Sequence, residues 1–301
     1  MNSLAFLLLT VASALEAADP GAVIAIGDRR ELLVDQFLVD KLSDGARLQL
    51  HQPVPREIVL HTDAPWEGNA CGYQSVFQDG EIYRMYYHGG HYRHGGKPAE
   101  ARPDHPWFLC YAESDDGIHW RRPELGLFEF EGSKANNIIL RPESVAAIQG
   151  DPAHTAVFKD GNPDCPADAR YKCVIVGKPH GLYLLESADG IRFRVAGEKP
   201  VITQGAFDSE NLAFWDPLRK EYRAYWRIFT AGVADGTAWK PEGIRAIRTA
   251  TSKDLLTWSP PADLKYVDSP PEQLYTNQIQ SYYRAPHIFM GFPMRYTDRG
   301  W

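Results

Sequence analysis

The sequence has few cysteines, little helical patterning and almost no long hydrophobic runs. Its 4 cysteines in 301 residues include no Cys-x-x-Cys pair, which excludes a zinc ribbon and a thioredoxin-like redox motif. Outside the N-terminal region, no stretch is long and apolar enough to span a bilayer, and no apolar pattern keeps a period of 3.6 residues. The sequence also lacks a Gly-x-Ser-x-Gly elbow, a phosphate-binding glycine loop and a His-Glu-x-x-His pair.

The charge pattern lacks a block of basic residues, and the formal net charge is −7. Proteins that bind nucleic acid or anionic membranes present clustered Lys and Arg, so we expect neither partner. No motif points to a cofactor, and we expect none.

The N-terminal residues resemble an export signal. An apolar run from Leu4 to Leu15 contains Ala12-Ser13-Ala14, a small-x-small cleavage pattern, although no Lys or Arg precedes it. We predict a signal peptide at residues 1–18 and a secreted or periplasmic protein whose single domain covers residues 22–301. The alternatives are a membrane anchor or a misassigned start.

In an exported protein, Cys165 and Cys173 would flank a turn and could form a disulfide, with free thiols as the alternative.

A short pattern, Ser-x-Asp-x-x-x-aromatic, occurs three times, about seventy residues apart: SDDGIHW (114–120), SADGIRF (187–193) and SKDLLTW (252–258). Its Ser and Asp side chains can close a turn by accepting local backbone N–H groups. Gly117 and Gly190 can take a positive φ there, and the closing Trp or Phe would pack between neighbouring units.

Strand patterns precede each copy. The strand directly before it is apolar, at 108–113, 181–186 and 244–251. Further upstream, two aromatic-rich strands flank a turn of Asp with Gly or Pro, at 76–87, 157–176 and 213–226. A repeated all-β unit of this size is typical of β-propeller blades.

The repeats predict three full blades and part of a fourth, which begins at residues 277–296. We interpret the domain as incomplete at its C-terminus. The alternative is a four-bladed ring in which residues 31–40 add a closing strand. The polar, Pro/Gly-rich segment 91–106 is predicted to be a long loop.

The repeat motifs resemble the five-bladed β-propeller glycosidases, which comprise the invertase and levanase, arabinanase and xylosidase, and mannoside phosphorylase groups. The resemblance rests on TSKDLLTW and FDSENLAFWDPLRKEYRAYW, and it covers roughly residues 65–296. It implies an all-β propeller with acids placed just ahead of its inner strands. A sialidase Asp box is a poorer match, because here Gly follows Asp directly.

Glycoside hydrolysis needs two carboxyl groups that face one sugar, so we looked for acids ahead of the inner strands. Glu67 precedes the first, where the resembled families place the nucleophile or base. Asp208 precedes the third, as charge stabiliser or acid, and Glu210 could fill the same position. These three are the candidate catalytic residues, although only Asp151 keeps the Asp-Pro pairing of those families.

Candidate substrate-binding residues lie in the same loops: Trp66, Asp151, His154 and Asn277. An aromatic ring can stack on a sugar, although Trp66 would equally pack between blades. His88, His91 and His94 recur at three-residue spacing but lack a Cys or Glu partner in register, so we expect no metal site. The predicted function is cleavage of oligo- or polysaccharides by paired carboxylates. The alternatives are a non-catalytic carbohydrate-binding propeller and an inactive truncated one.

Overall fold

Asp, Gly and Pro residues separate the aromatic and β-branched segments of each repeat, and the computed structural model shows those segments as antiparallel strands. The structure describes residues 23–93, 102–266 and 269–299. The predicted signal peptide lies outside these residues. Within them, no helix is long and apolar enough to cross a membrane.

The chain divides into two units, Met1–Val54 and Pro55–Trp301. In the first unit, the described residues 23–54 form turns and bends but no strand or helix. Residues 31–40 therefore do not form the closing strand that the sequence suggested. Several of their apolar side chains are exposed, including those of Val34 and Phe37.

The described residues of the second unit form three four-stranded antiparallel sheets, the first of them extended by a fifth short strand, and one two-stranded sheet. The first sheet has the order β1 (Gly72–Asp79), β2 (Ile82–Arg93), β3 (Arg102–Ser114) and β4 (Trp120–Arg121), with β5 (Ile138–Leu140) also paired to β3. The second has β6 (Phe158–Lys159), β7 (Tyr171–Gly177), β8 (Gly181–Ser187) and β9 (Arg194–Val195). The third has β10 (Leu212–Asp216), β11 (Glu221–Ala234), β12 (Trp239–Ser252) and β13 (Ala262–Asp263). The last pairs β14 (Gln280–Tyr282) with β15 (Ala285–Met290).

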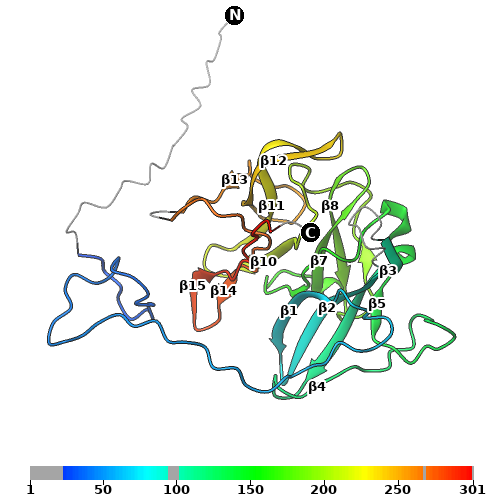
Figure 1. Ribbon diagram of the computed structural model, residues 1–301, viewed down its shortest axis with the longest axis horizontal. Helices are drawn as coiled ribbons and strands as arrows, with labels where there is room; N and C mark the ends of the chain where they lie inside the picture. The colour runs from blue at the N-terminus through cyan, green and yellow to red at the C-terminus, as the bar shows by residue number, and fades with distance from the viewer. Residues whose placement is uncertain (1–22, 94–101, 267–268, 300–301) are drawn as a thin grey trace, which may run out of the picture. The chain divides into compact units, whose positions relative to one another are not determined.

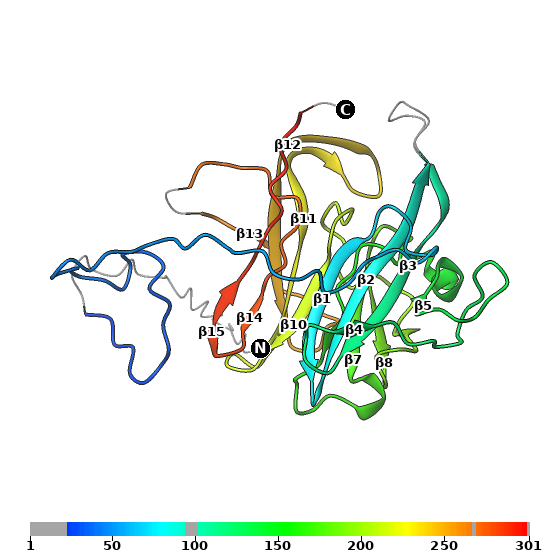
Figure 2. The same cartoon turned by 60° about the horizontal axis from the view of Figure 1, so that its bottom comes forward.

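The order of strands confirms the all-β prediction of three full blades and part of a fourth. Figures 1 and 2 show β1, β10 and β14 close together, and residues of β1, β6, β10 and β14 line one shared space. We call β1, β6, β10 and β14 the inner strands. Two short 3₁₀ helices, Pro142–Ile148 and Ala167–Ala169, lie in the connections.

Successive sheets pack face to face, so the middle strands of the second sheet and residues 224–228 of β11 are buried on both faces. On β11, Ala224 and Trp226 pack with Val174 of the second sheet, whereas Tyr225 between them packs with Ile279 near the fourth. Alternate side chains of a strand point to opposite faces, so an uninterrupted apolar run is what such a position requires.

The repeated turn has the same geometry in all three sheets. Each Ser hydroxyl oxygen accepts the backbone N–H groups two and three residues later, at 2.9–3.3 Å. Each Asp carboxylate does the same at 2.7–2.8 Å. The residue after the Asp has a positive φ: Gly117 and Gly190 at 76° and Leu255 at 66°. Leu255 lacks the freedom of glycine, but its buried side chain joins the core between the second and third sheets.

The segment 91–106 is not one long loop, as the sequence suggested. Strand β2 continues to Arg93 and β3 begins at Arg102, so the hairpin projects beyond the inner strand β1; residues 94–101 are outside the described part.

The suggested disulfide is also absent, because Cys165 and Cys173 are both free. Instead, the Cys165 Sγ accepts a hydrogen bond from the Lys172 ammonium group at 3.0 Å.

Candidate functional site

A polar loop precedes each inner strand, and hydrogen bonds tie these loops together. The Asn211 backbone and side-chain N–H groups donate to the His154 carbonyl oxygen at 3.0 and 2.8 Å. The Asn277 side chain donates to the Glu210 carbonyl oxygen at 3.0 Å. The loops of the second, third and fourth sheets therefore meet at one end of the inner strands, which we call the entrance.

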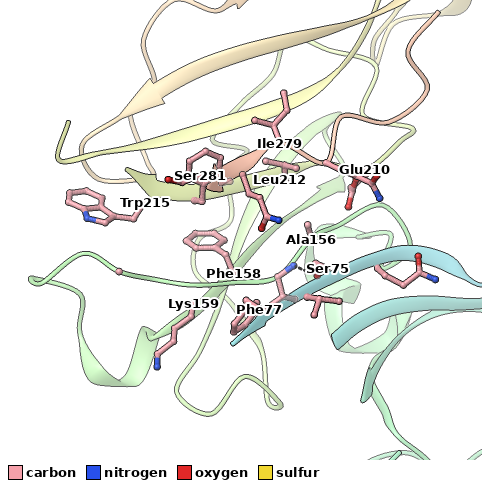
Figure 3. Close-up of a pocket in the computed structure, with 18 of the residues that line it drawn as sticks. Ser75, Phe77, Ala156, Phe158, Lys159, Glu210, Leu212, Trp215, Ile279 and Ser281 are labelled. Carbon is pink, nitrogen blue, oxygen red and sulfur yellow. Dashed lines mark hydrogen bonds between the residues drawn. The ribbon is translucent and has the colours of Figure 1, made fainter. Parts of the chain in front are cut away.

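A pocket of about 570 Å³ lies between the inner strands. This volume falls within the range of ordinary ligand pockets, roughly 300–1,000 Å³. Figure 3 shows side chains from all four inner-strand segments turned toward it, among them Phe77, Phe158, Leu212 and Ile279. Glu210 lies at one end of this largely apolar space.

The carboxyl group of Glu210 is almost completely buried. The residue is 2% exposed, and its Oε2 has no hydrogen-bond partner among the described residues. Burial raises the pKa of Glu210 to about 7, and a backbone hydrogen bond from Gln278 offsets only part of the effect. Glu210 is therefore half protonated near neutral pH, which suits a general acid.

Asp208, two residues earlier, forms an ion pair with Arg227 of β11. The Arg227 side chain is 4% exposed, whereas that of Asp208 is 34% exposed. The Arg227 guanidinium also lies 4.7 Å from the centre of the Tyr275 ring. Asp208 thus presents an accessible carboxylate beside a fixed positive charge.

Asp151 and His154 form a second accessible pair, with 2.8 Å between Asp151 Oδ2 and His154 Nδ1. Burial alone would raise the pKa of Asp151, but the hydrogen bond and charge of His154 lower it below its usual value. Asp151 therefore stays ionised under conditions in which Glu210 is protonated.

Tyr73 connects the two pairs. Its ring lies 4.7 Å from the His88 ring and 5.7 Å from the His154 ring. Burial raises the pKa of Tyr73, and the neighbouring Tyr275 raises it further. The phenol therefore stays neutral between the loops of the first, second and fourth sheets.

The sequence reasoning did not select three of these residues: Tyr73, Arg227 and Tyr275. Tyr73 is the second residue of the inner strand β1, and Tyr275 lies in the loop ahead of β14, so their positions were a usable signal. Arg227 gave no such signal, because it lies within β11, and its contact with Asp208 arises only when the folded chain brings β11 next to the loop ahead of β10.

Glu67 and Trp66 lie elsewhere, against the first sheet. Glu67 has no exposed surface. Its carboxylate accepts hydrogen bonds from Tyr87 at 2.6 Å, from Arg122 at 2.8 and 3.0 Å, and from the Ala64 N–H at 2.9 Å. The Trp66 indole donates to Asn137 at 2.6 Å and meets Phe130 edge-on. A carboxylate enclosed by four donors holds its loop in place and has no face for a substrate.

Of the histidine run, His88 is buried. His88 is 8% exposed, and burial lowers its pKa, so the ring is neutral at neutral pH. His94 falls outside the described residues. Among residues 23–93, 102–266 and 269–299, no group of three or more His, Cys, Asp or Glu side chains is arranged to hold a metal ion.

No protein-family model matches the sequence, and no curated protein is significantly similar to it. Similar solved structures include a glycosyl hydrolase from Bacteroides ovatus, with 14% identity, a TM-score of 0.39, and coverage of 64% of this chain and 51% of that one. Another is the β-1,2-mannobiose phosphorylase of Listeria innocua in complex with β-1,2-mannobiose, with 14% identity, a TM-score of 0.38, and coverage of 66% and 60%. The chain thus spans about half to three fifths of these proteins. Similarity at this level does not extend to activity.

Proposed function

We propose that the entrance binds a carbohydrate and that Glu210 donates a proton to the oxygen of the glycosidic bond being cleaved. The main support is the contrast between two carboxyl groups that belong to one cluster of loops. Burial holds Glu210 protonated up to about neutral pH, whereas His154 keeps Asp151 ionised. In glycosidases, such a difference in pKa between two carboxyl groups makes one of them the acid and the other the base or nucleophile.

The ionised partner in this proposal is Asp151, which activates water or attacks the anomeric carbon. Its side chain is 35% exposed, so a sugar can reach it. Asp208 stabilises positive charge that develops on the ring, and Arg227 fixes its position. Glu67 has no part in the chemistry, because its carboxylate is enclosed.

Aromatic rings support a carbohydrate ligand. Tyr73 and Tyr275 are only partly buried at the entrance, and Trp107 packs against His88 at 4.7 Å on the adjoining hairpin. Sugars present C–H faces that pack well on aromatic rings. The leader-like residues 1–18 fit an exported enzyme that meets extracellular polysaccharide.

Carbohydrate binding without cleavage is the second candidate, and the burial of Glu210 favours it. A group that is 2% exposed reaches a substrate only if the sugar enters the pocket or the loop adjusts. A binding protein would keep its affinity for glycans when Glu210 is replaced, and it would release no product.

Aryl glycosides with different leaving groups test the proposal. Dinitrophenolate leaves without a proton, whereas methanol and most sugars need one. We expect Glu210→Gln to slow cleavage of methyl or disaccharide substrates by roughly 10²–10⁴-fold and to change dinitrophenyl glycosides little. Glu242→Gln, an exposed carboxyl on β12, is the matched control. An equal loss on both substrate types would rule out Glu210 as the acid, and wild-type binding without cleavage would favour the second candidate.

A further inference from the structure

Arg245 of β12 lies next to the entrance without a carboxylate partner among the described residues. It stands opposite Phe229 in the β11–β12 ladder. Its guanidinium lies 3.9 Å from the centre of the Tyr296 ring and 5.2 Å from that of Phe229. Its Nη1 donates to Gln273 Oε1 at 2.7 Å, and its Nε has no acceptor within the described part of the chain.

The charges around Arg245 do not balance. Arg227 is paired with Asp208, and Arg295 is paired with Glu272 at 3.0 Å. Of these three guanidinium groups, that of Arg245 is the one without a carboxylate partner among the described residues. A partly buried, uncompensated cation is costly to maintain and attracts an anion.

The position of Arg245 connects this excess charge to the candidate site. The Tyr275 ring lies between two guanidinium groups, 4.7 Å from that of Arg227 and 5.8 Å from that of Arg245. One aromatic ring thus separates Arg245 from the Asp208 ion pair. Arg245 therefore lies beside the loop that precedes the fourth inner strand.

We propose that Arg245 binds a carboxylate group of the substrate, so that the site selects glycans that contain uronic acid. This inference rests on the proposed function, because it assumes a glycan at the entrance. A guanidinium group matches a carboxylate with two parallel hydrogen bonds. The rings of Tyr296 and Phe229 beside it provide an apolar surface for the C–H face of the same sugar, which inorganic phosphate lacks.

The test compares acidic and neutral glycans by titration calorimetry on the full chain. The probes are oligogalacturonides and glucuronic-acid-containing oligosaccharides, each with its methyl ester as the neutral counterpart. We expect the free acids to bind the wild-type protein about tenfold or more tightly than the esters. Arg245→Gln should remove this preference. Arg248→Gln should keep it, because Arg248 lies on the same strand but is paired with Asp263.

Equal binding of acids and esters, or no binding of any acidic probe, would overturn the inference. So would binding of inorganic phosphate that depends on Arg245 without a preference for acidic sugars. These measurements need no turnover, so they separate the two proposals. Repeating them with Glu210→Gln shows whether the preference persists when the assigned proton donor is absent. A preserved preference with unchanged cleavage would reject the acid assignment alone.

Discussion

Arg227 reaches from the middle strand of the third sheet to the carboxylate of Asp208, and the cation is far more buried than the anion. The same guanidinium lies against the rings of Phe229 and Tyr275, at 5.3 and 4.7 Å. A buried cation such as Arg227 depends on its counter-ion for stabilisation, whereas water can solvate a partly exposed anion such as Asp208.

Asp208→Asn should therefore destabilise the fold by about 2–3 kcal/mol, because Arg227 stays buried without a full negative charge. Urea denaturation measures the change. The double variant Asp208→Asn/Arg227→Met should recover part of it. Asp263→Asn is the comparison, since it breaks an exposed pair with Arg248 and should cost less than about 1 kcal/mol. Equal costs for Asp208→Asn and Asp263→Asn would contradict this account.

Glu210 should make stability depend on pH. Burial raises the pKa of Glu210 to about 7 in the folded protein, from 4.5 for an exposed glutamate. Between these values the folded state keeps a proton that the unfolded state releases, so the free energy of unfolding falls as pH rises from about 4.5 to about 7. Glu210→Gln removes this loss.

The variant should match the wild type at pH 4 and exceed its free energy of unfolding by up to about 3 kcal/mol at pH 8. Thermal and urea unfolding across this range measure the difference. Glu242→Gln should leave the profile unchanged. A constant difference between Glu210→Gln and wild type at all pH values would show that the carboxyl does not titrate as described.

Glu67→Gln distinguishes a structural role from a catalytic one. Loss of the charge leaves Arg122 without its buried partner, so we expect a destabilisation of about 2–3 kcal/mol. Tyr87→Phe removes a single donor and should cost about 1 kcal/mol. The pH dependence of any cleavage should not move in Glu67→Gln. Normal stability with a large fall in kcat would return Glu67 to the catalytic set.

Gly90 should not tolerate a side chain. A Cβ there would lie 2.2 Å from two ring carbons of Trp107, which packs on His88 beside the entrance. Gly90→Ala should lower stability by about 1–3 kcal/mol and weaken glycan binding as Trp107 shifts. Gly197→Ala is the control, since a Cβ at Gly197 meets nothing within 4 Å. Unchanged melting temperature and affinity in Gly90→Ala would show that Trp107 can move without cost.

The repeating sheets could be predicted from the sequence because their signals are local. Alternating apolar residues, Asp-Gly turns and the Ser-x-Asp closure act within a few residues of one another. The length of the β2–β3 hairpin could not be predicted from the sequence. Residues that project beyond the core need no apolar side chains to keep their backbone pairing. Composition therefore suggested a loop at 91–106, whereas His91–Arg93 pair with residues 102–105.

The candidate site was predicted only in part, for a physical reason. The structure places Asp151, His154, Asp208 and Glu210 in the loops that meet at the entrance, and their roles in binding and catalysis stay predictions. Position ahead of an inner strand also selected Glu67, and nothing local shows that Tyr87 and Arg122 enclose it. Burial and pairing between different sheets decide which carboxyl stays protonated, and these depend on the three-dimensional arrangement.

The identical turn in three sheets gives the molecule three matched anchoring points. His119, Arg192 and Thr257 occupy equivalent exposed positions in it. Spin labels attached there would share one local geometry, so differences between the measured distances would report only the angles between sheets. The three matched positions thus allow changes in the arrangement of the sheets to be followed when a ligand is added.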